Sequence, residues 1–399
     1  MPVAAAPLIR RLRLAAGLGL FAYVVCHLVN HALGLISYEA METGLTWALV
    51  LWRSALGTVV LYGAFAVHLG LGLWSLYRRR TLRMPPWEAA QLVLGLAIPP
   101  ILLFHMSSTR LADALLGTTP SYARTLLRLW VVDPQAGLRQ VFLLLIAWTH
   151  GCMGLHFWLR FRPWYGRLSQ ALYALAWLIP LLALLGFAAG PREAATIGRT
   201  TPGFTEGLGR TPAPVTAEER AAPGRVFRAA LATYGLALAG VLAARGMRAL
   251  GRRRGGSIRI SYPGRREVVV PRGWSGLEAS RFGRLPHASV CGGRGPCSTC
   301  RIRVLGPVRD LPPPSADERR VLERLGAPAN VRLACQLRPA RDLAVVPLMP
   351  AVLAPRDAAL QVGARHGRER EIAVLFADLR GFTRLAEHKL PFDVVFFLN

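Results

Sequence analysis

Charged residues are scarce in this chain, and lysine is almost absent. Only 18% of the 399 residues are charged, acidic residues number 22, and Lys389 is the only lysine. Because 53% of the residues are hydrophobic, the chain is too apolar for an intrinsically disordered protein. The composition also excludes collagen and a small disulfide scaffold. The length suits two to three domains of about 150 residues each.

The net charge of +27 is almost entirely due to arginine. A strongly basic chain can be a nucleic-acid-binding protein. An arginine bias can also reflect genome composition, and arginines that flank membrane spans give the same excess. Since the arginines gather beside long apolar stretches, the composition favours membrane lipid as the partner and does not predict nucleic-acid binding.

Six long apolar stretches lie in the first 245 residues, and they are residues 14–36, 47–77, 89–108, 138–160, 170–190 and 227–245. Each is long enough, or nearly so, to cross a bilayer as a helix, which takes about 20 residues. The first stretch is too long for a simple signal peptide. Six buried helices of a soluble protein would need a very large polar shell. The sequence therefore predicts an all-α membrane bundle of six spans over residues 1–250.

The arginines beside these stretches predict how the bundle is oriented. They precede the first stretch, fill the second and fourth connections, and follow the sixth stretch. By the positive-inside rule, the N-terminus and everything after residue 245 are then cytoplasmic. An even number of spans returns the chain to the side on which it began, so the count and the charges agree.

Six of the nine histidines fall within the predicted spans, and they are His27, His31, His68, His105, His150 and His156. Ionisable groups inside a membrane are costly and are therefore functional candidates. At about 1.5 Å per residue from the cytoplasmic side, His31 and His105 both lie roughly 27 Å deep. By the same measure His68 and His150 both lie about 15 Å deep. The histidines thus form two level pairs, each on alternate helices.

A flat macrocycle with one axial imidazole on each side needs such pairs. We therefore expect two b-type haems, one between His31 and His105 and one between His68 and His150. His27 is an alternative to His31, and His156 is a candidate for contact with a haem propionate or a quinone headgroup. A single haem, and a metal or proton pathway, remain as alternatives. Nearby small residues would leave room for a porphyrin, and they are Gly63, Gly70, Gly72, Gly151 and Gly154.

Two histidine-containing segments also resemble a known family. Residues 26–31 (CHLVNH) and 149–156 (THGCMGLH) resemble the dihaem cytochrome b anchors of succinate dehydrogenase and fumarate reductase. The resemblance implies electron exchange with membrane quinone. Those anchors typically carry their haem ligands on a different set of helices, so the pairing expected here depends on the depth estimate.

Four of the six cysteines follow the pattern C-x5-C-x2-C-x34-C, and they are Cys291, Cys297, Cys300 and Cys335. Four thiolates suit either zinc or an iron–sulfur cluster. Zinc ribbons more often use two C-x2-C pairs, and this segment has one. The glycine-rich loop between the first two cysteines can wrap its backbone around a small cluster. The pattern therefore favours iron–sulfur over zinc.

The surrounding segment has the pattern of a small α+β domain. Residues 257–262 and 266–270 alternate around a Pro-Gly turn, which predicts a hairpin. Helices are expected near residues 276–282 and over residues 315–325, where Ser315 and Glu318 form a capping box, and a closing strand is expected over residues 341–347. With the cysteine spacing, residues 257–350 resemble the [2Fe–2S] ferredoxins of the adrenodoxin-like type. The resemblance implies a β-grasp fold and one [2Fe–2S] cluster.

The last 29 residues contain an apolar strand, 371–376, that leads to Asp378, followed by glycine and threonine. Such an arrangement suits a metal-bound phosphate site. Residues 371–399 resemble the start of the class III adenylate/guanylate cyclase domain, an α/β fold. The resemblance implies that Asp378 and the carbonyl of Leu379 bind Mg2+ or Mn2+. The family's other catalytic residues would follow Asn399, so we expect a truncated cyclase domain that is inactive alone, joined by a linker over residues 351–370.

The three modules in this order resemble bacterial redox-regulated membrane adenylate cyclases. The resemblance implies a multi-pass protein of the bacterial inner membrane, a homodimer whose full-length parent converts ATP to cyclic AMP under control of quinone. One alternative is a membrane electron-transfer protein, a cytochrome b/ferredoxin component without signalling output. Another is a structural anchor whose histidines bind nothing.

Overall fold

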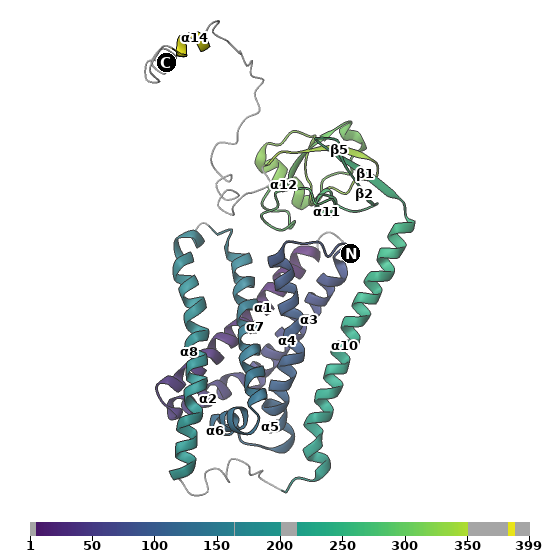
Figure 1. Cartoon of the computed structure of the whole chain (residues 1–399). Coiled ribbons are helices and arrows are strands. Elements are labelled where there is room, and N and C mark those ends of the chain that lie inside the picture. Colours follow the sequence, from purple (N-terminus) through teal and green to yellow (C-terminus); the bar gives the residue numbers. More distant parts are fainter. Residues whose placement is uncertain (1–4, 163, 201–213, 350–381, 388–399) are drawn as a thin grey trace. The chain divides into compact units, whose positions relative to one another are not determined.

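The computed structural model describes residues 5–162, 164–200, 214–349 and 382–387 (Figure 1). The chain divides into two units, Met1–Val362 and Gly363–Asn399. Within the second unit only α14, Phe382–Glu387, is described. The predicted linker 351–370, the predicted strand 371–376 and the predicted metal ligands Asp378 and Leu379 lie outside the described residues.

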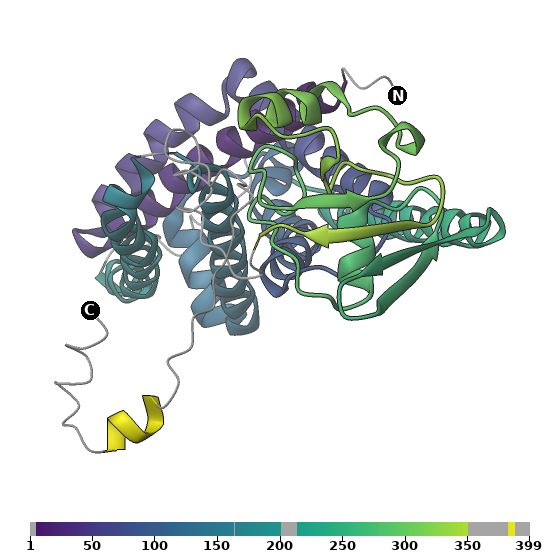
Figure 2. The ribbon, with the colours of Figure 1, turned by 90° about the horizontal axis from the view of Figure 1, so that it is seen from above.

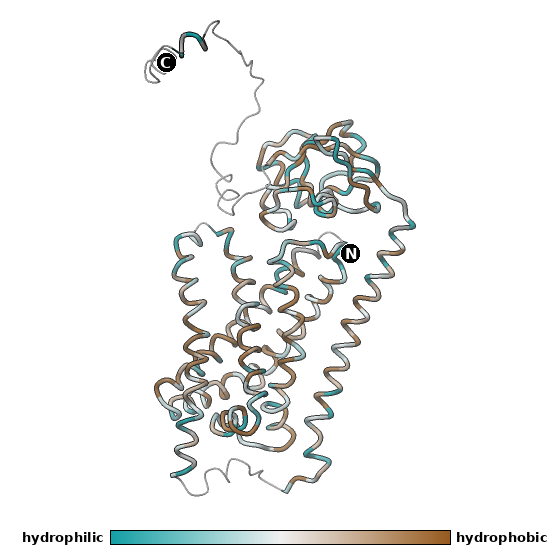
Figure 3. Tube along the Cα trace, in the orientation of Figure 1, coloured by the Kyte–Doolittle hydropathy of each residue, from teal (hydrophilic) through white to brown (hydrophobic). Residues whose placement is uncertain are grey.

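The N-terminal part of the first unit is helical. Among the described residues, six helices are long and apolar enough to cross a membrane, as the sequence predicts. They belong to α1 (Ala5–Ala32), α3 (Ala55–Arg78), α4 with α5 (Pro86–Ser108 and Arg110–Leu116), α7 (Pro134–Leu159), α8 (Tyr165–Thr200) and α10 (Ala217–Arg254). Colouring by hydropathy shows apolar residues along these helices (Figure 3). Large side chains such as Trp177 and Leu236 are exposed on them, which suits a lipid surrounding.

The second predicted stretch, residues 47–77, is divided between two helices. Tyr38–Trp52 forms α2, and α3 begins at Ala55. The Ser54 side chain caps α3 by accepting a hydrogen bond from the Gly57 backbone N–H at 3.0 Å. Arg53, between the two helices, forms an ion pair with Asp113 at 2.5 Å. One charge and one capping residue thus interrupt a stretch that is apolar on average.

Helix packing brings the histidine-bearing helices together. Helix α1 packs against α3 and α8, and α4 packs against α7 and α10. Short helices fill the connection between α5 and α7, including α6 (Tyr122–Leu127). Glu42 of α2 holds the start of α6, because its carboxylate accepts hydrogen bonds from the Ser121 hydroxyl at 2.7 Å and the Tyr122 backbone N–H at 2.8 Å.

Residues 257–347 form a mixed five-stranded sheet with short helices (Figure 2). The strand order is β2-β1-β5-β3-β4, in which β1 is parallel to β5 and the other neighbours are antiparallel. The architecture is consistent with a ferredoxin fold. The strands are β1 (Ser257–Tyr262), β2 (Arg266–Pro271), β3 (Arg301–Leu305), β4 (Val331–Leu333) and β5 (Leu343–Pro347), and the helices are α11 (Gly276–Phe282) and α12 (Ala316–Leu325).

The predicted hairpin, the two helices and the closing strand are all present in the sheet domain. Alternate residues of β1, Ile258 and Ile260, are buried in its core. Gly264 and Arg265 make the hairpin turn with φ of 75° and 57°, the left-handed region that glycine adopts at little cost. Strands β3 and β4 were not predicted. Strand β4 is three residues long and fully buried, so it has no alternating pattern to recognise.

The predicted capping box of α12 is only half formed, which corrects the sequence prediction. The Ser315 hydroxyl accepts a hydrogen bond from the Glu318 backbone N–H at 3.2 Å, as expected. The Glu318 carboxylate, however, pairs with the guanidinium of Arg332 at 2.9 Å. A buried arginine needs a counter-charge, and this need takes the carboxylate away from the helix start.

Candidate functional site

The loop that carries the first three cysteines follows α11 and leads into β3. Its backbone turns sharply at Gly292, Gly293 and Gly295, which have φ of 71°, 92° and 102°. A side chain at such angles would be strained. At Gly293 an added Cβ would also lie 3.2 Å from Leu277. The glycines are therefore what allows the loop to close around the thiols of Cys291 and Cys297.

The four thiols are buried, with residue exposures between 1% and 6%, and they lie in two pairs. The Cys291 backbone N–H donates to Cys297 Sγ at 3.3 Å. The hydrogen bond from the Cys297 thiol lowers the pKa of Cys291 to about 5. In the second pair, the Cys300 thiol hydrogen-bonds to Cys335. This hydrogen bond raises the pKa of Cys300, and burial of the thiol raises it further.

No group of three or more histidine, cysteine, aspartate or glutamate side chains surrounds a single point within the part of the chain that the structure describes. The cysteines of the predicted set are therefore brought together two by two, Cys291 with Cys297 and Cys300 with Cys335. The loop and the segment before Cys335 meet because the Ala334 backbone N–H donates to the Cys300 carbonyl at 2.9 Å.

Two residues that the sequence analysis missed complete the surroundings of the first pair. The buried Thr299 hydroxyl is 3.0 Å from Cys297 Sγ and accepts a hydrogen bond from the Val290 backbone N–H, also at 3.0 Å. Phe161, which follows α7 in the helical bundle, packs with Val290 against Cys291 and Cys297. Threonine two residues after a cysteine is a weak signal, and the sequence gives no signal for Phe161.

The second predicted site is the level pair His68 on α3 and His150 on α7. Their ring centroids are 6.2 Å apart, and the rings are perpendicular. The Nδ1 atom of His68 lies 3.1 Å from the Arg13 carbonyl, and that of His150 lies 3.1 Å from the Gln91 carbonyl. A carbonyl only accepts, so both Nδ1 atoms carry the proton. Each ring therefore keeps a free electron pair on Nε2, the state in which histidine binds a metal.

Glycines let the neighbouring helices approach these two rings. A Cβ at Gly17 of α1 would lie 2.9 Å from His68 Cε1, and a Cβ at Gly95 of α4 would lie 2.7 Å from His150 Cε1. Of the five glycines singled out from the sequence, two approach other side chains: a Cβ at Gly151 would meet Phe21, and a Cβ at Gly154 would lie 3.5 Å from Gln91 Nε2. Nothing lies within 4 Å of a Cβ built at Gly63, Gly70 or Gly72. The close approach to the histidines is therefore made by glycines of other helices.

In the other predicted pair, His31 with His105, the ring of His27 contacts both members, with ring centroids 4.6 Å from His31 and 5.9 Å from His105. The Nε2 atoms of His27 and His31 are 3.2 Å apart. The ring that stacks edge-on against His105 is that of His27, at 5.9 Å, while His31 has Tyr122 and Phe187 as further ring neighbours. The structure thus places the alternative ligand, His27, in ring contact with both His105 and the predicted ligand, His31.

His156, the remaining candidate, lies near the end of α7. Its Nδ1 atom is 2.9 Å from the Tyr165 hydroxyl at the start of α8. The side chain is exposed and lies apart from the two histidine groups. Tyr165 therefore accounts for one nitrogen of His156.

Comparison with known proteins recognises the sheet domain. Residues 261–340 match the family of the 2Fe-2S iron-sulfur cluster binding domain. The match contains all four paired cysteines. The comparison with curated proteins and the comparison with solved structures give no match. The sheet domain is thus of the 2Fe–2S ferredoxin type, which indicates an iron–sulfur redox function beside six candidate membrane spans.

Proposed function

We propose that this chain is the sensing part of a membrane redox protein. A [2Fe–2S] cluster and two b haems would respond to quinone and regulate a C-terminal adenylate cyclase. The match of residues 261–340 supports the cluster. The geometry of His68 and His150 is the observation that supports the haems most directly.

The pairwise order of the cysteines fits a two-iron cluster. In a [2Fe–2S] cluster, each of the two irons takes two thiolates. A structural zinc ion would require all four thiolates around one point. Cys291 with Cys297 would hold one iron, and Cys300 with Cys335 the other. The cluster would supply a one-electron carrier at this place.

The spacing of His68 and His150 fits two axial ligands of one iron. An imidazole nitrogen binds a metal at about 2 Å, so two rings bound from opposite sides have centroids roughly 6 Å apart. The observed 6.2 Å agrees with this value. The carbonyls of Arg13 and Gln91 hold both rings in the tautomer that leaves Nε2 free. A b haem between them would supply a second one-electron carrier.

Haem binding is tested on the purified full chain by the visible spectrum and by extraction of haem as its pyridine complex. We expect two low-spin b haems per chain. His68→Ala or His150→Ala should remove one of them, and His31→Ala or His105→Ala the other. His156→Ala is the matched control and should retain both. A wild-type chain without haem would refute this part of the proposal, and retention of both haems in His105→Ala with loss in His27→Ala would reassign the second pair.

The cluster is tested by iron analysis and by the EPR signal of the reduced protein. Cys300→Ser should abolish or weaken the signal because it removes one thiolate. Cys152→Ser changes a cysteine of α7, outside the paired set, and should leave the signal unchanged. Stoichiometric zinc without iron, after anaerobic purification from iron-replete cells, would overturn the assignment.

The signalling output rests on the resemblance of residues 371–399 to the class III cyclases. In a protein with a whole cyclase domain, Asp378 and the Leu379 carbonyl would bind Mg2+ or Mn2+ at a site for ATP, and two copies would form the active dimer. Asp378→Ala should abolish cyclic AMP synthesis and leave haem and cluster spectra intact. Activity that is identical with oxidised and reduced quinone, while both redox centres change state, would leave a cyclase without sensing. A protein that makes no cyclic nucleotide would favour the electron-transfer alternative.

A further inference from the structure

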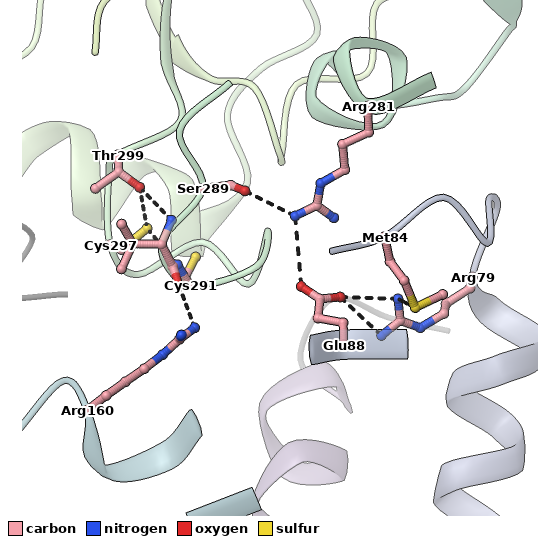
Figure 4. A network of polar contacts seen from close by, with 10 residues as sticks. Arg79, Met84, Glu88, Arg160, Arg281, Ser289, Cys291, Cys297 and Thr299 are labelled. Atoms are coloured by element: carbon pink, nitrogen blue, oxygen red, sulfur yellow. Dashed lines mark hydrogen bonds and ion pairs between the residues drawn. The ribbon is translucent and has the colours of Figure 1, made fainter. Parts of the chain in front are cut away.

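The cysteine loop contacts the ends of bundle helices on both sides of Cys291 (Figure 4). Arg160, directly after α7, donates through Nη2 to the Val290 carbonyl at 2.5 Å. Its guanidinium carbon lies 5.1 and 5.0 Å from the ring centroids of Phe157 and Phe161. The cation is thus held by its own helix end and points at the residue that precedes the first cysteine.

A carboxylate meets the loop on the other side of Cys291. Glu88 lies in the first turn of α4, and a Cβ added at Gly292 would lie only 2.6 Å from Glu88 Oε1. The Glu88 side chain is 11% exposed and pairs with Arg79 at 3.3 Å and with Arg281 of α11 at 3.9 Å. Arg281 in turn donates to the Ser289 hydroxyl at 3.0 Å. A buried negative charge is therefore fixed against the loop.

The same two helices hold His150. His150 lies on α7, ten residues before Arg160, a distance of about 15 Å along the helix. Gln91, one turn after Glu88, binds His150 twice. Its carbonyl lies 3.1 Å from His150 Nδ1, and its side-chain amide donates to the His150 carbonyl, also at 3.1 Å. One turn of α4 thus contacts the cysteine loop through Glu88 and the histidine through Gln91.

We propose that Arg160 and Glu88 are positioning residues that dock the cysteine loop on the bundle, and that their opposite charges shift the cluster's midpoint potential in opposite directions. The inference rests on the proposed function, because it requires the cluster. Reduction adds one electron to the cluster and makes it more negative. A nearby cation stabilises the reduced state and a nearby carboxylate destabilises it, and both effects are strong where water is excluded.

The test is a potentiometric titration of the cluster's EPR signal in the full chain, with dithionite as the reductant. In Arg160→Gln, the ratio of reduced to oxidised cluster at a fixed potential should fall about tenfold, equal to about −59 mV for one electron. In Glu88→Gln it should rise by a similar factor. Arg160→Lys keeps the charge and should remain close to wild type.

Two variants serve as matched controls. Arg162→Gln removes a cation two residues further on, whose guanidinium lies 6.0 Å from the Trp158 ring centroid. Glu39→Gln removes a carboxylate of α2. Helix α2 follows the C-terminal end of α1, whereas the cysteine loop lies near the N-terminal end of α1. Neither should shift the potential. Hydrogen exchange of residues 289–300 is the second readout, and it should be faster in Arg160→Gln and Glu88→Gln than in the controls.

The possible outcomes separate this inference from the proposed function. Opposite shifts with faster exchange support the docking role. Shifts of the same sign, or none beyond the controls, overturn it while the cluster signal remains. If Arg160→Gln loses the cluster, the titration of Glu88→Gln tests the docking role alone: a higher midpoint potential supports it, and an unchanged or lower potential overturns it. A wild-type chain without a cluster signal overturns the proposed function itself.

Discussion

The Thr299 hydroxyl reaches both the backbone before Cys291 and the sulfur of Cys297. A hydrogen bond to a ligand sulfur stabilises the more negative, reduced cluster. We therefore expect Thr299→Val to lower the midpoint potential, by on the order of 1 kcal/mol of reduced-state stability. Thr299→Ser keeps the hydroxyl and should restore the wild-type value. The EPR titration measures both, and an unchanged potential in the valine variant would show that the contact is only structural.

Glu318 and Arg332 form an ion pair whose side chains are 1% and 4% exposed. The carboxylate also accepts the Leu333 backbone N–H at 2.9 Å, so it joins α12 to β4. Removal of one partner from a buried pair costs roughly 3–5 kcal/mol. Glu318→Gln should therefore lower the free energy of unfolding of the sheet domain by about this amount.

The experiment is urea unfolding of the full chain in detergent, followed by the cluster's visible absorption. Asp317→Asn is the matched control, because Asp317 is the neighbouring carboxylate but is 36% exposed in its surface pairs. Its loss should cost less than about 1 kcal/mol. Equal stability of the two variants would contradict the role of the buried pair.

Among the elements, α4 meets both proposed redox sites, through Glu88 at the cysteine loop and Gln91 at His150, and Gly95 lets it approach the His150 ring. An alanine there would place its Cβ 2.7 Å from His150 Cε1. The imidazole would have to move, since α4 and α7 are packed together along their lengths. We expect Gly95→Ala to reduce the amount of haem bound at His68 and His150 and to leave the haem at His105 unchanged.

Gly72→Ala is the control for this prediction, because nothing lies within 4 Å of a Cβ at Gly72. That position should accept alanine without change in haem content. Haem content and the visible spectrum of each purified variant provide the measurement. Full haem retention in Gly95→Ala would show that the helix pair can separate without loss of the ligand.

For the whole molecule, we expect the N-terminus and the sheet domain both to face the cytoplasmic side of the membrane. The arginine distribution predicts this arrangement, and Arg10 of α1 supports it through a hydrogen bond to the Arg294 carbonyl at 3.2 Å and an ion pair with Asp317 at 3.5 Å. Reporter fusions measure it. A phosphatase that is active only outside the cytoplasm should be inactive when it is fused after Leu82 and active when it is fused after Thr118. The reverse pattern would refute the orientation.

The amino-acid sequence by itself determined the features that depend on neighbouring residues. Runs of about 20 apolar residues specify spans, a Pro-Gly turn between alternating strands specifies the hairpin, and the cysteine spacing specifies the ferredoxin-type loop. The level pair of His68 and His150 was also predictable, because helical rise converts residue number into depth.

Only the tertiary structure decided the contacts between distant segments. The partner of Glu318 proved to be Arg332 rather than its own helix start, because a buried guanidinium attracts a carboxylate more strongly than a helix cap does. The glycines that let neighbouring helices approach His68 and His150 are Gly17 and Gly95. The cation that binds the cysteine loop is Arg160, which lies 130 residues before its partner Val290. Such contacts follow from how whole helices and the sheet pack, and local periodicity does not encode that packing.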